Sequence, residues 1–432
     1  MEKLKKILLM ALILLLPYHH QIISVLLSDF KVLKFWKELV IFLLVLITFI
    51  QIVSGKKKLK ITRFETALIL FMAVVFIYVC ISDSMYQALY ISRVYFMPMF
   101  LVPVVKYMDI TFRDVKNALC MVMASTLVLC VWGIIQAQFL GDGFLVDMGY
   151  RTQRVRHMLK LKNEFYILGG GFMQRVVSTF AAPNTFGMYL SIVITVVMYL
   201  FKPLKINRKF AYITLFISAL TLILTFSRTS WIACVAALTM NFIMFVKWDR
   251  AVKRKAALCV AGGFAAFILF DILILHSGIA MAGIRLIGNT VTGKDSSLIG
   301  HLSSWIESVV KVVKHPFGLG LGKNGPRAML FIKKPNLTES SYFLMAYEVG
   351  ILGAIVYYSS YIIAAVDSIR LYKKTENRNV IMILSVILII GIGYLSLPFI
   401  QDFELLVFMY VIVSLQYNEL VINRVEEKGI TA

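Results

Sequence analysis

The sequence is poor in the residues that build metal centres and disulfide frameworks. It has 5 cysteines and 6 histidines in 432 residues. All the cysteines fall within apolar runs, and the histidines show no H-x-x-x-H spacing. The sequence therefore predicts no disulfide framework and no metal site.

Acidic residues are also scarce, since 23 Asp and Glu stand against 45 Lys and Arg, a formal net charge of +22. No acidic pair of the kind that holds a metal-bound nucleotide falls in a loop expected to face the cytoplasm, which argues against a nucleotide-sugar transferase. In a soluble protein such a charge would suggest nucleic acid. Here the basic residues cluster between apolar runs, as topology signals do, and we expect no nucleic-acid partner.

Apolar residues dominate the chain, at 60% of the sequence, and the mean hydropathy is +0.82. The runs 39–50, 67–81 and 380–392 contain no charged residue. Runs of this kind suit the hydrocarbon core of a bilayer, and they lack the polar alternation of barrel strands, so the spanning backbone must be helical. We predict an all-α polytopic membrane protein, a single integral membrane domain over 1–432 with about twelve transmembrane helices. The predicted spans are 7–28, 35–53, 66–82, 90–108, 117–138, 184–201, 209–226, 229–247, 256–275, 340–364, 379–397 and 402–418.

Short basic loops set the predicted orientation. Every even-numbered span except the last is followed by a cluster of Lys and Arg, for example at 56–63, 202–209 and 370–378. Because positive loops stay in the cytoplasm, both termini are predicted to be cytoplasmic. One short outer loop, with Lys31, Lys34 and Lys37, disagrees.

Two loops, 140–183 and 276–339, are too long for simple turns and face outward in this topology. They contain aromatic and aliphatic residues throughout, so we expect them to fold over the membrane surface rather than to be disordered.

Candidate chemistry gathers near the outer face. Arg175 lies just before Pro183-Asn184, a plausible helix start, and an arginine beside a helix N-terminus suits an anion. The simpler interpretation is an interfacial arginine at the edge of a span. Arg228 interrupts the apolar stretch 211–246, where it either binds an anion or extends toward the membrane surface.

The second long loop offers further candidates. Lys323 and Arg327 follow a glycine-rich stretch, at 318–322, whose backbone N–H groups could face an anion. This stretch is one residue short of a phosphate loop, so that interpretation is rejected. Glu339 opens the span 340–364 and suits a general base, or else is a helix charge favoured by the dipole.

Five short motifs follow one another between residues 175 and 353. They are R..STF..PN..G.YL from Arg175, TFSR ending at Arg228, HLSSW from His301 to Trp305, HPFGLGLG at 315–322 and ESSYF....E.GILG from Glu339. Over 175–353 this order resembles the O-antigen ligase and polysaccharide polymerase superfamily of bacterial envelopes. Glu339 stands where ligases typically carry a histidine, which favours the polymerase branch. His301 stands where many members carry an arginine.

The resemblance implies a glycosyltransferase of the cytoplasmic membrane that joins polyprenyl-diphosphate-linked oligosaccharide repeat units on the outer face, for capsule, O-antigen or exopolysaccharide, with no metal, nucleotide or other cofactor. Arg228 and Arg175 would bind the diphosphate and Glu339 would act as base. The remaining substrate-binding candidates in the outer loop are His301, Trp305, Lys323 and Arg327. Other polysaccharide-assembly proteins are implied partners. The alternatives are a transporter or flippase of lipid-linked sugars, which would leave the length of its cargo unchanged, and a ligase of the same superfamily.

Overall fold

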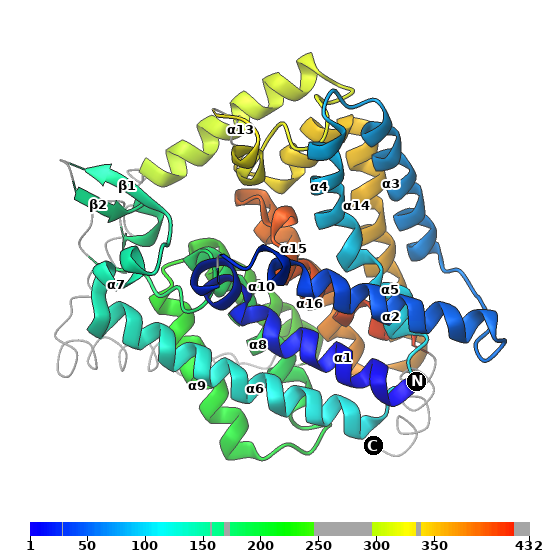
Figure 1. Cartoon of the computed structure of the whole chain (residues 1–432). Helices are drawn as coiled ribbons and strands as arrows, with labels where there is room; N and C mark the ends of the chain where they lie inside the picture. The colour runs from blue at the N-terminus through cyan, green and yellow to red at the C-terminus, as the bar shows by residue number, and fades with distance from the viewer. Residues whose placement is uncertain (28, 156–157, 168–172, 246–295, 334–337, 419–432) are drawn as a thin grey trace.

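The computed structural model describes residues 1–27, 29–155, 158–167, 173–245, 296–333 and 338–418. Its α-helices are α1 (Glu2–Leu15), α2 (Trp36–Val53), α3 (Arg63–Cys80), α4 (Met85–Met99), α5 (Leu101–Lys106), α6 (Phe112–Ile135), α7 (Gly141–Asp147), α8 (Pro183–Leu200), α9 (Arg208–Leu224), α10 (Arg228–Phe245), α13 (Ser296–Lys314), α14 (Ser341–Thr375), α15 (Arg378–Ser396) and α16 (Phe403–Ser414). Shorter helical segments are η1 (Leu16–Tyr18), η2 (His20–Leu26), η3 (Lys31–Phe35), η4 (Gln136–Leu140), η5 (Asn163–Phe165), η8 (Pro326–Leu330), η9 (Phe399–Gln401) and η10 (Leu415–Tyr417). Figure 1 shows their arrangement.

The predicted spans coincide well with these helices. The span 256–275 lies outside the described residues, and each of the others overlaps at least one helix. Within the described ranges, seven helices are long and apolar enough to cross a membrane. The structure therefore confirms a largely helical, multi-pass membrane protein, while the count of twelve spans and the cytoplasmic termini stay predictions.

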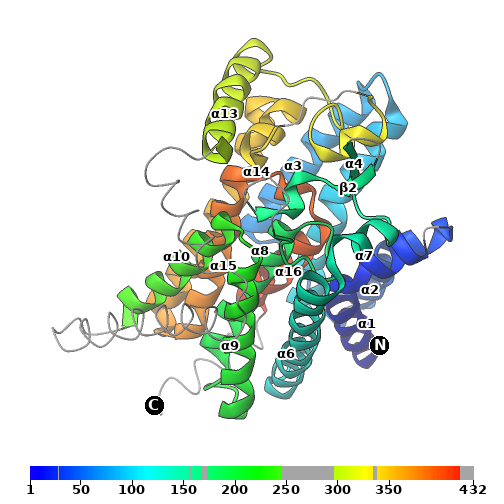
Figure 2. The ribbon, with the colours of Figure 1, turned by 90° about the vertical axis from the view of Figure 1, so that its left-hand side faces the viewer.

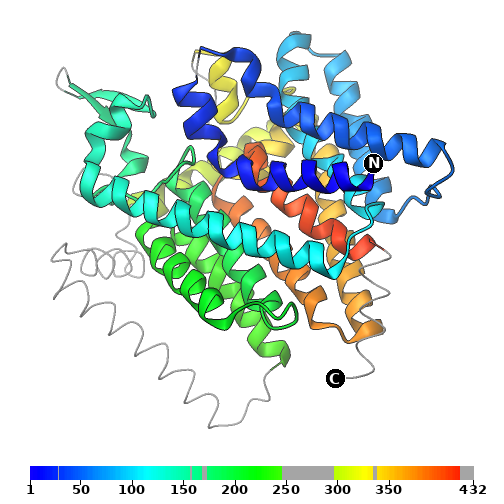
Figure 3. The ribbon, with the colours of Figure 1, turned by 60° about the horizontal axis from the view of Figure 1, so that its bottom comes forward.

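Local sequence signals set where two of the spans begin. Thr62 accepts a hydrogen bond from the backbone of Glu65, whose carboxylate in turn accepts from the backbone of Thr62. Thr111 and Asp114 make the same reciprocal pair at the start of α6. Such capping boxes satisfy N–H groups that a helix start leaves open. From this start α6 runs alongside α1, as Figure 3 shows.

The first long loop contains a feature that the sequence did not suggest. An antiparallel hairpin joins β1 (Thr152–Val155) to β2 (Met158–Leu161), with Thr152 opposite Leu161. The hairpin and α7 enclose a small apolar cluster that includes Leu145, Leu161 and Phe165. This cluster gives the loop a core of its own, as expected for a folded loop.

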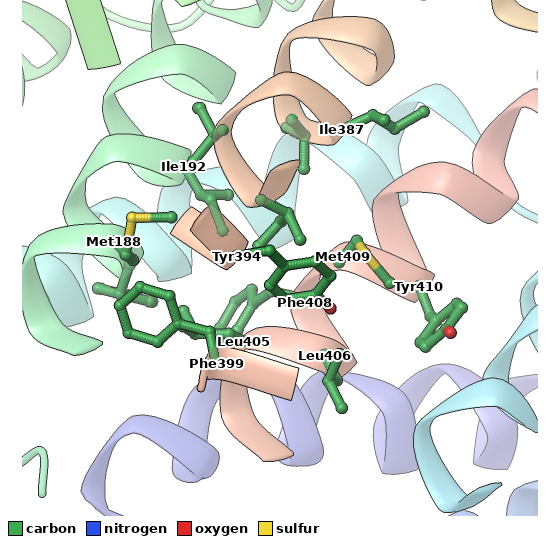
Figure 4. Packing of buried hydrophobic residues seen from close by; sticks show 14 of the residues in the cluster. Met188, Ile192, Ile387, Tyr394, Phe399, Leu405, Leu406, Phe408, Met409 and Tyr410 are labelled. Atoms are coloured by element: carbon green, nitrogen blue, oxygen red, sulfur yellow. The ribbon is translucent and has the colours of Figure 1, made fainter. Parts of the chain in front are cut away.

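The main core lies between α8, α14, α15 and α16. Figure 4 shows Met188 and Ile192 of α8 near Tyr394 of α15, with Phe399 and Phe408 packed beside them. Tyrosine hydroxyls extend a hydrogen-bonded chain through the same core, from Tyr357 to Tyr361 at 2.6 Å and from Tyr361 to Tyr394 at 3.0 Å. Buried hydroxyls require such partners because an unpaired one is costly in an apolar interior.

Helix α14 is broken at Val349 and Gly350, whose backbone angles are not helical. The glycine-rich loop docks at this break: Leu319 donates its N–H to the Tyr347 carbonyl at 2.7 Å, and Ile351 donates to the Pro316 carbonyl at 2.9 Å. The approach is so close that a side chain on Gly318 would lie 2.6 Å from the Gly350 nitrogen. The loop and the broken helix therefore form one rigid unit.

The buried Glu348 carboxylate stabilises this unit through two hydrogen bonds. Its carboxylate accepts hydrogen bonds from the Tyr95 hydroxyl at 2.5 Å and from the Gly322 backbone N–H at 2.9 Å. The side chain is fully buried. Glu348, the second glutamate of the ESSYF....E.GILG motif, thus joins α4, the loop and α14.

Candidate functional site

Residues 396–402, where α15 ends and α16 begins, receive contacts from segments far away in sequence, and we call them the α15–α16 junction. Thr185 donates to the Asp402 carboxylate at 2.8 Å. The Thr229 and Ser396 hydroxyls lie 2.6 Å apart. Ser341 donates to the Leu397 carbonyl at 2.7 Å. The junction thus joins three parts of the chain that the sequence keeps apart.

These contacts bring four helix starts together. Thr185 lies in the first turn of α8, Thr229 in that of α10, and Ser341 begins α14. The junction itself leads into α16 at Phe403. Each helix N-terminus carries about half a positive elementary charge from its peptide dipoles. These four helix starts outnumber the two helix C-termini nearby, those of α15 and α9, so the dipoles leave a net positive partial charge that favours negatively charged groups.

Arg175 connects the start of α8 and the turn before α10 through hydrogen bonds. Its guanidinium donates to the Thr225 carbonyl at 2.6 Å, to the Asn184 side-chain oxygen at 2.6 Å and to the Glu164 carbonyl at 2.9 Å. The side chain is buried, and burial lowers the pKa of Arg175 to about 10, with a further lowering from the Arg228 cation. The structure therefore brings these two sequence-predicted arginines within electrostatic range of each other.

Arg228 opens α10 after a strained turn. Phe226 has a φ of +48°, which is unusual for a bulky residue. The Ser227 and Ser230 hydroxyls lie 2.8 Å apart across the turn. A side chain at Gly187 would lie 2.7 Å from the Ser230 hydroxyl oxygen, which explains the glycine of the PN..G motif. The half-exposed Arg228 is thus held at a helix N-terminus by residues of its own TFSR segment and of the PN..G motif.

Arg327 and Glu339 reach the junction from the second long loop. The Arg327 Nε donates to the Gln401 carbonyl at 3.0 Å. Glu339 is followed by Ser340, whose hydroxyl donates to the Tyr394 carbonyl at 2.9 Å in the last turns of α15. Both side chains are half-buried. Arg327 is therefore anchored at the α15–α16 junction, and the residue after Glu339 is anchored to the last turns of α15.

The other predicted residues lie elsewhere. Lys323 forms an ion pair of 2.6 Å with Asp83 before α4, and its ammonium holds the pKa of Asp83 below its usual range. Trp305 lies on α13, and its buried indole N–H has no hydrogen-bond partner within the described part of the chain. His301 lies in the same helix, but its side chain is outside the described part of the structure. None of the contacts described for these three involves the junction.

Asp402 is the functional candidate that sequence reasoning missed. Burial raises its pKa to about 6, and the Glu404 carboxylate nearby adds to the rise, whereas Thr185 and Arg327 oppose it. A carboxylate that titrates near neutral pH is a candidate proton acceptor. The available signal was the polar pair Gln401-Asp402 between two apolar runs, on the predicted outer side.

The site combines helix starts and arginines, which attract an anion, with carboxylates, which accept a proton. Among the described residues, no group of three or more His, Cys, Asp or Glu side chains is placed to hold a metal ion. Such a site can stabilise a departing anion while a neighbouring carboxylate activates a hydroxyl.

These features define the class: a multi-pass helical membrane protein with a polar, anion-favouring site between its helix starts. Residues 213–358 match the family described as O-antigen ligase. The O-antigen polymerase of Salmonella muenchen is 28% identical over 140 residues, an alignment that covers 28% of this chain and 35% of that relative. The chain thus spans about a third of the relative's length. These matches confirm the resemblance to the O-antigen ligase and polysaccharide polymerase superfamily, whose bacterial members lie in the cytoplasmic membrane. Arg175 and Asp402 lie outside the matched region.

Proposed function

We propose that this protein is a polysaccharide polymerase that joins polyprenyl-diphosphate-linked oligosaccharide repeat units on the outer face of the cytoplasmic membrane. The observation that carries the proposal is the convergence of four helix N-termini with Arg228 at the α15–α16 junction. A diphosphate bears the negative charge that such a site favours. The superfamily match supports the same substrate class.

In the proposed reaction, a hydroxyl of the acceptor sugar attacks the anomeric carbon of the donor glycan. The bond from that carbon to the diphosphate oxygen breaks, and the polyprenyl diphosphate leaves with the electron pair. The hydroxyl proton passes to a carboxylate of the protein. Atoms and charges balance without another reactant, and the main demands on the protein are charge stabilisation and positioning.

The residues divide these tasks. Arg228 and the helix starts stabilise the leaving diphosphate, because a guanidinium pairs well with phosphate oxygens. Arg175 holds the turn that presents Arg228, and its remaining N–H groups can serve the same anion. Glu339 is the proposed base. Asp402 is a second carboxylate at the junction, and the pH dependence of transfer separates the two.

The outer-loop residues are proposed to hold the glycan. Arg327 is fixed to the junction through Gln401 and so lies nearest to the reacting sugars. Trp305 offers the face of its indole ring to a sugar, and His301 belongs to the same helix. Lys323 lies beyond them, beside Asp83.

The test is a polymerisation assay. The purified protein is given lipid-diphosphate oligosaccharide repeat units without metal or nucleotide, and the products are separated on a sizing gel. We expect a ladder spaced by one repeat unit. Arg228→Ala should abolish it, whereas Arg208→Ala, at an exposed arginine that begins α9, should not.

Each other outcome has a distinct meaning. Full-length polymer from Arg228→Ala would remove that residue from the mechanism. Transfer of a preformed glycan to a different acceptor, without a ladder, would identify a ligase. Movement of the repeat unit across liposomes at unchanged length would identify a transporter or flippase.

A further inference from the structure

Helix α13 exposes a row of large apolar side chains. Ile299, Leu302, Ile306, Val309 and Val313 are between 48% and 69% exposed, and we call them the α13 stripe. Their spacing of three and four residues places them along one side of the helix. A contiguous apolar surface of this kind normally has a partner.

The other sides of α13 are of different character. Ser308 and Val312 are buried against the rest of the molecule, where α13 contacts α14. Lys311 pairs with Glu307 at 3.7 Å on a third side. Although 19 residues would be long enough, α13 is not among the helices apolar enough to span a membrane. In Figure 2 it lies at the opposite end of the molecule from the N-terminus.

Exposed apolar residues continue beyond α13 toward two of the spanning helices. After α13 the chain reaches Phe317, which is 76% exposed. Its carbonyl accepts a hydrogen bond from Tyr78 of α3, and its backbone packs against Gly350 of α14. Ile81, directly after α3, and Leu352 of α14 are also largely exposed. In a multi-pass membrane protein, exposed apolar side chains on spanning helices face lipid.

We propose that α13 lies in the plane of the membrane, with its stripe inserted among the lipids at the boundary between headgroups and acyl chains. An amphipathic helix with an apolar face and basic residues beside it has this preference. Lys311 and Lys314 can extend to the headgroups while their stems cover apolar surface. Lipid contact would then fix the height of His301 and Trp305 above the bilayer. The inference depends on the protein being in a membrane and not on the polymerase activity.

The first test compares two adjacent positions. Ile306→Cys and Glu307→Cys are made with Cys80, which is exposed, replaced by serine, and each is labelled with an environment-sensitive dye in liposomes. Lipids brominated on the acyl chain should quench the dye at 306 by at least about twofold more than the dye at 307, and aqueous iodide should show the opposite order. Equal iodide quenching at both positions, with no quenching by brominated lipid, would overturn the proposal.

A second test uses the unaltered chain. Lipids with a diazirine on the acyl chain are photolysed with the protein in liposomes, and adducts are mapped by mass spectrometry. We expect adducts on the α13 stripe as well as on α3 and α14. Adducts confined to the spanning helices would overturn the proposal, and crosslinks between the stripes of two chains would instead assign the surface to a second copy of this protein.

Discussion

Thr185 and Asp402 are 217 positions apart in sequence and are joined by a hydrogen bond of 2.8 Å. Thr185 belongs to the first turn of α8, and Asp402 directly precedes α16. The contact connects the PN..G motif to a carboxylate outside the region that matches the superfamily. It therefore makes the α15–α16 junction part of the candidate site rather than a connecting loop.

Thr185→Ala should raise the pH that polymerisation requires. The Thr185 hydroxyl lowers the pKa of Asp402, so its removal should raise that pKa above about 6. A hydrogen bond to a charged group contributes about 1.5–3 kcal/mol, which sets the scale of the loss. The pH profile of ladder formation measures the shift. Thr185→Ser keeps the hydroxyl and should behave as the parent, and an unchanged profile for the alanine variant would contradict the coupling.

Asp402→Asn should remove one titration from the activity. Because the carboxylate of the parent protein is charged above its pKa of about 6 and neutral below it, transfer should increase as the pH rises through that value. The asparagine can still accept the Thr185 hydrogen bond. Any change in transfer rate therefore comes from the lost negative charge of Asp402 and not from altered packing. Transfer rates between pH 5 and 8 test this. Glu339→Gln should abolish transfer throughout, whereas full activity of Asp402→Asn would leave Glu339 as the sole base.

Arg175→Ala should destabilise the folded protein. The change leaves the Thr225 carbonyl, the Glu164 carbonyl and the Asn184 amide oxygen without their donor. An unsatisfied buried acceptor costs about 1–3 kcal/mol, so the thermal midpoint in detergent should fall markedly. The matched control is Arg151→Ala, because Arg151 is exposed and its 3.7 Å ion pair with Glu164 should contribute no more than about 1 kcal/mol. Equal thermal midpoints for the two variants would show that the three hydrogen bonds of Arg175 do not stabilise the fold.

Glu348→Ala should loosen the glycine-rich loop. The Gly322 N–H and the Tyr95 hydroxyl would lose a buried partner, a larger loss than in Glu348→Gln, which retains an acceptor for Gly322. Tyr95→Phe should have an intermediate effect because it removes one of the two bonds. Limited proteolysis around 315–325 and the thermal midpoint measure the order of the three variants. If Glu348→Ala were instead the least affected of the three variants, the two hydrogen bonds of the Glu348 carboxylate would not stabilise the loop.

The helices could be predicted from the sequence because burial in lipid demands long apolar runs. The predicted span 340–364 starts within one residue of α14, yet α14 continues to Thr375 and breaks at Gly350. The break depends on the glycine-rich loop, which comes from another part of the chain. The hydrophobic periodicity of residues 341–375 therefore does not predict it. The β1–β2 hairpin was missed for a related reason, since its small core forms only when the loop folds upon itself.

The site was predicted in part. Arg175 and Arg228 could be found because charged residues beside apolar runs are conspicuous, and the structure brings them into electrostatic contact. The binding roles of all the predicted residues stay predictions. Asp402 escaped notice because its partners, Thr185 and Arg327, lie far from it in sequence. Glu348 was overlooked likewise, since its contact with Tyr95 spans 253 positions.

The place of the α15–α16 junction in the chain has a consequence for biosynthesis. The segments that begin α8, α10 and α14 are all made earlier than residues 396–402. During insertion the hydroxyls of Thr185, Thr229 and Ser341 cannot make these contacts until the junction that follows α15 has been synthesised. A ribosome that stalls before Ser396 would therefore leave an inserted chain in which the contacts of Thr185, Thr229 and Ser341 to the junction cannot form.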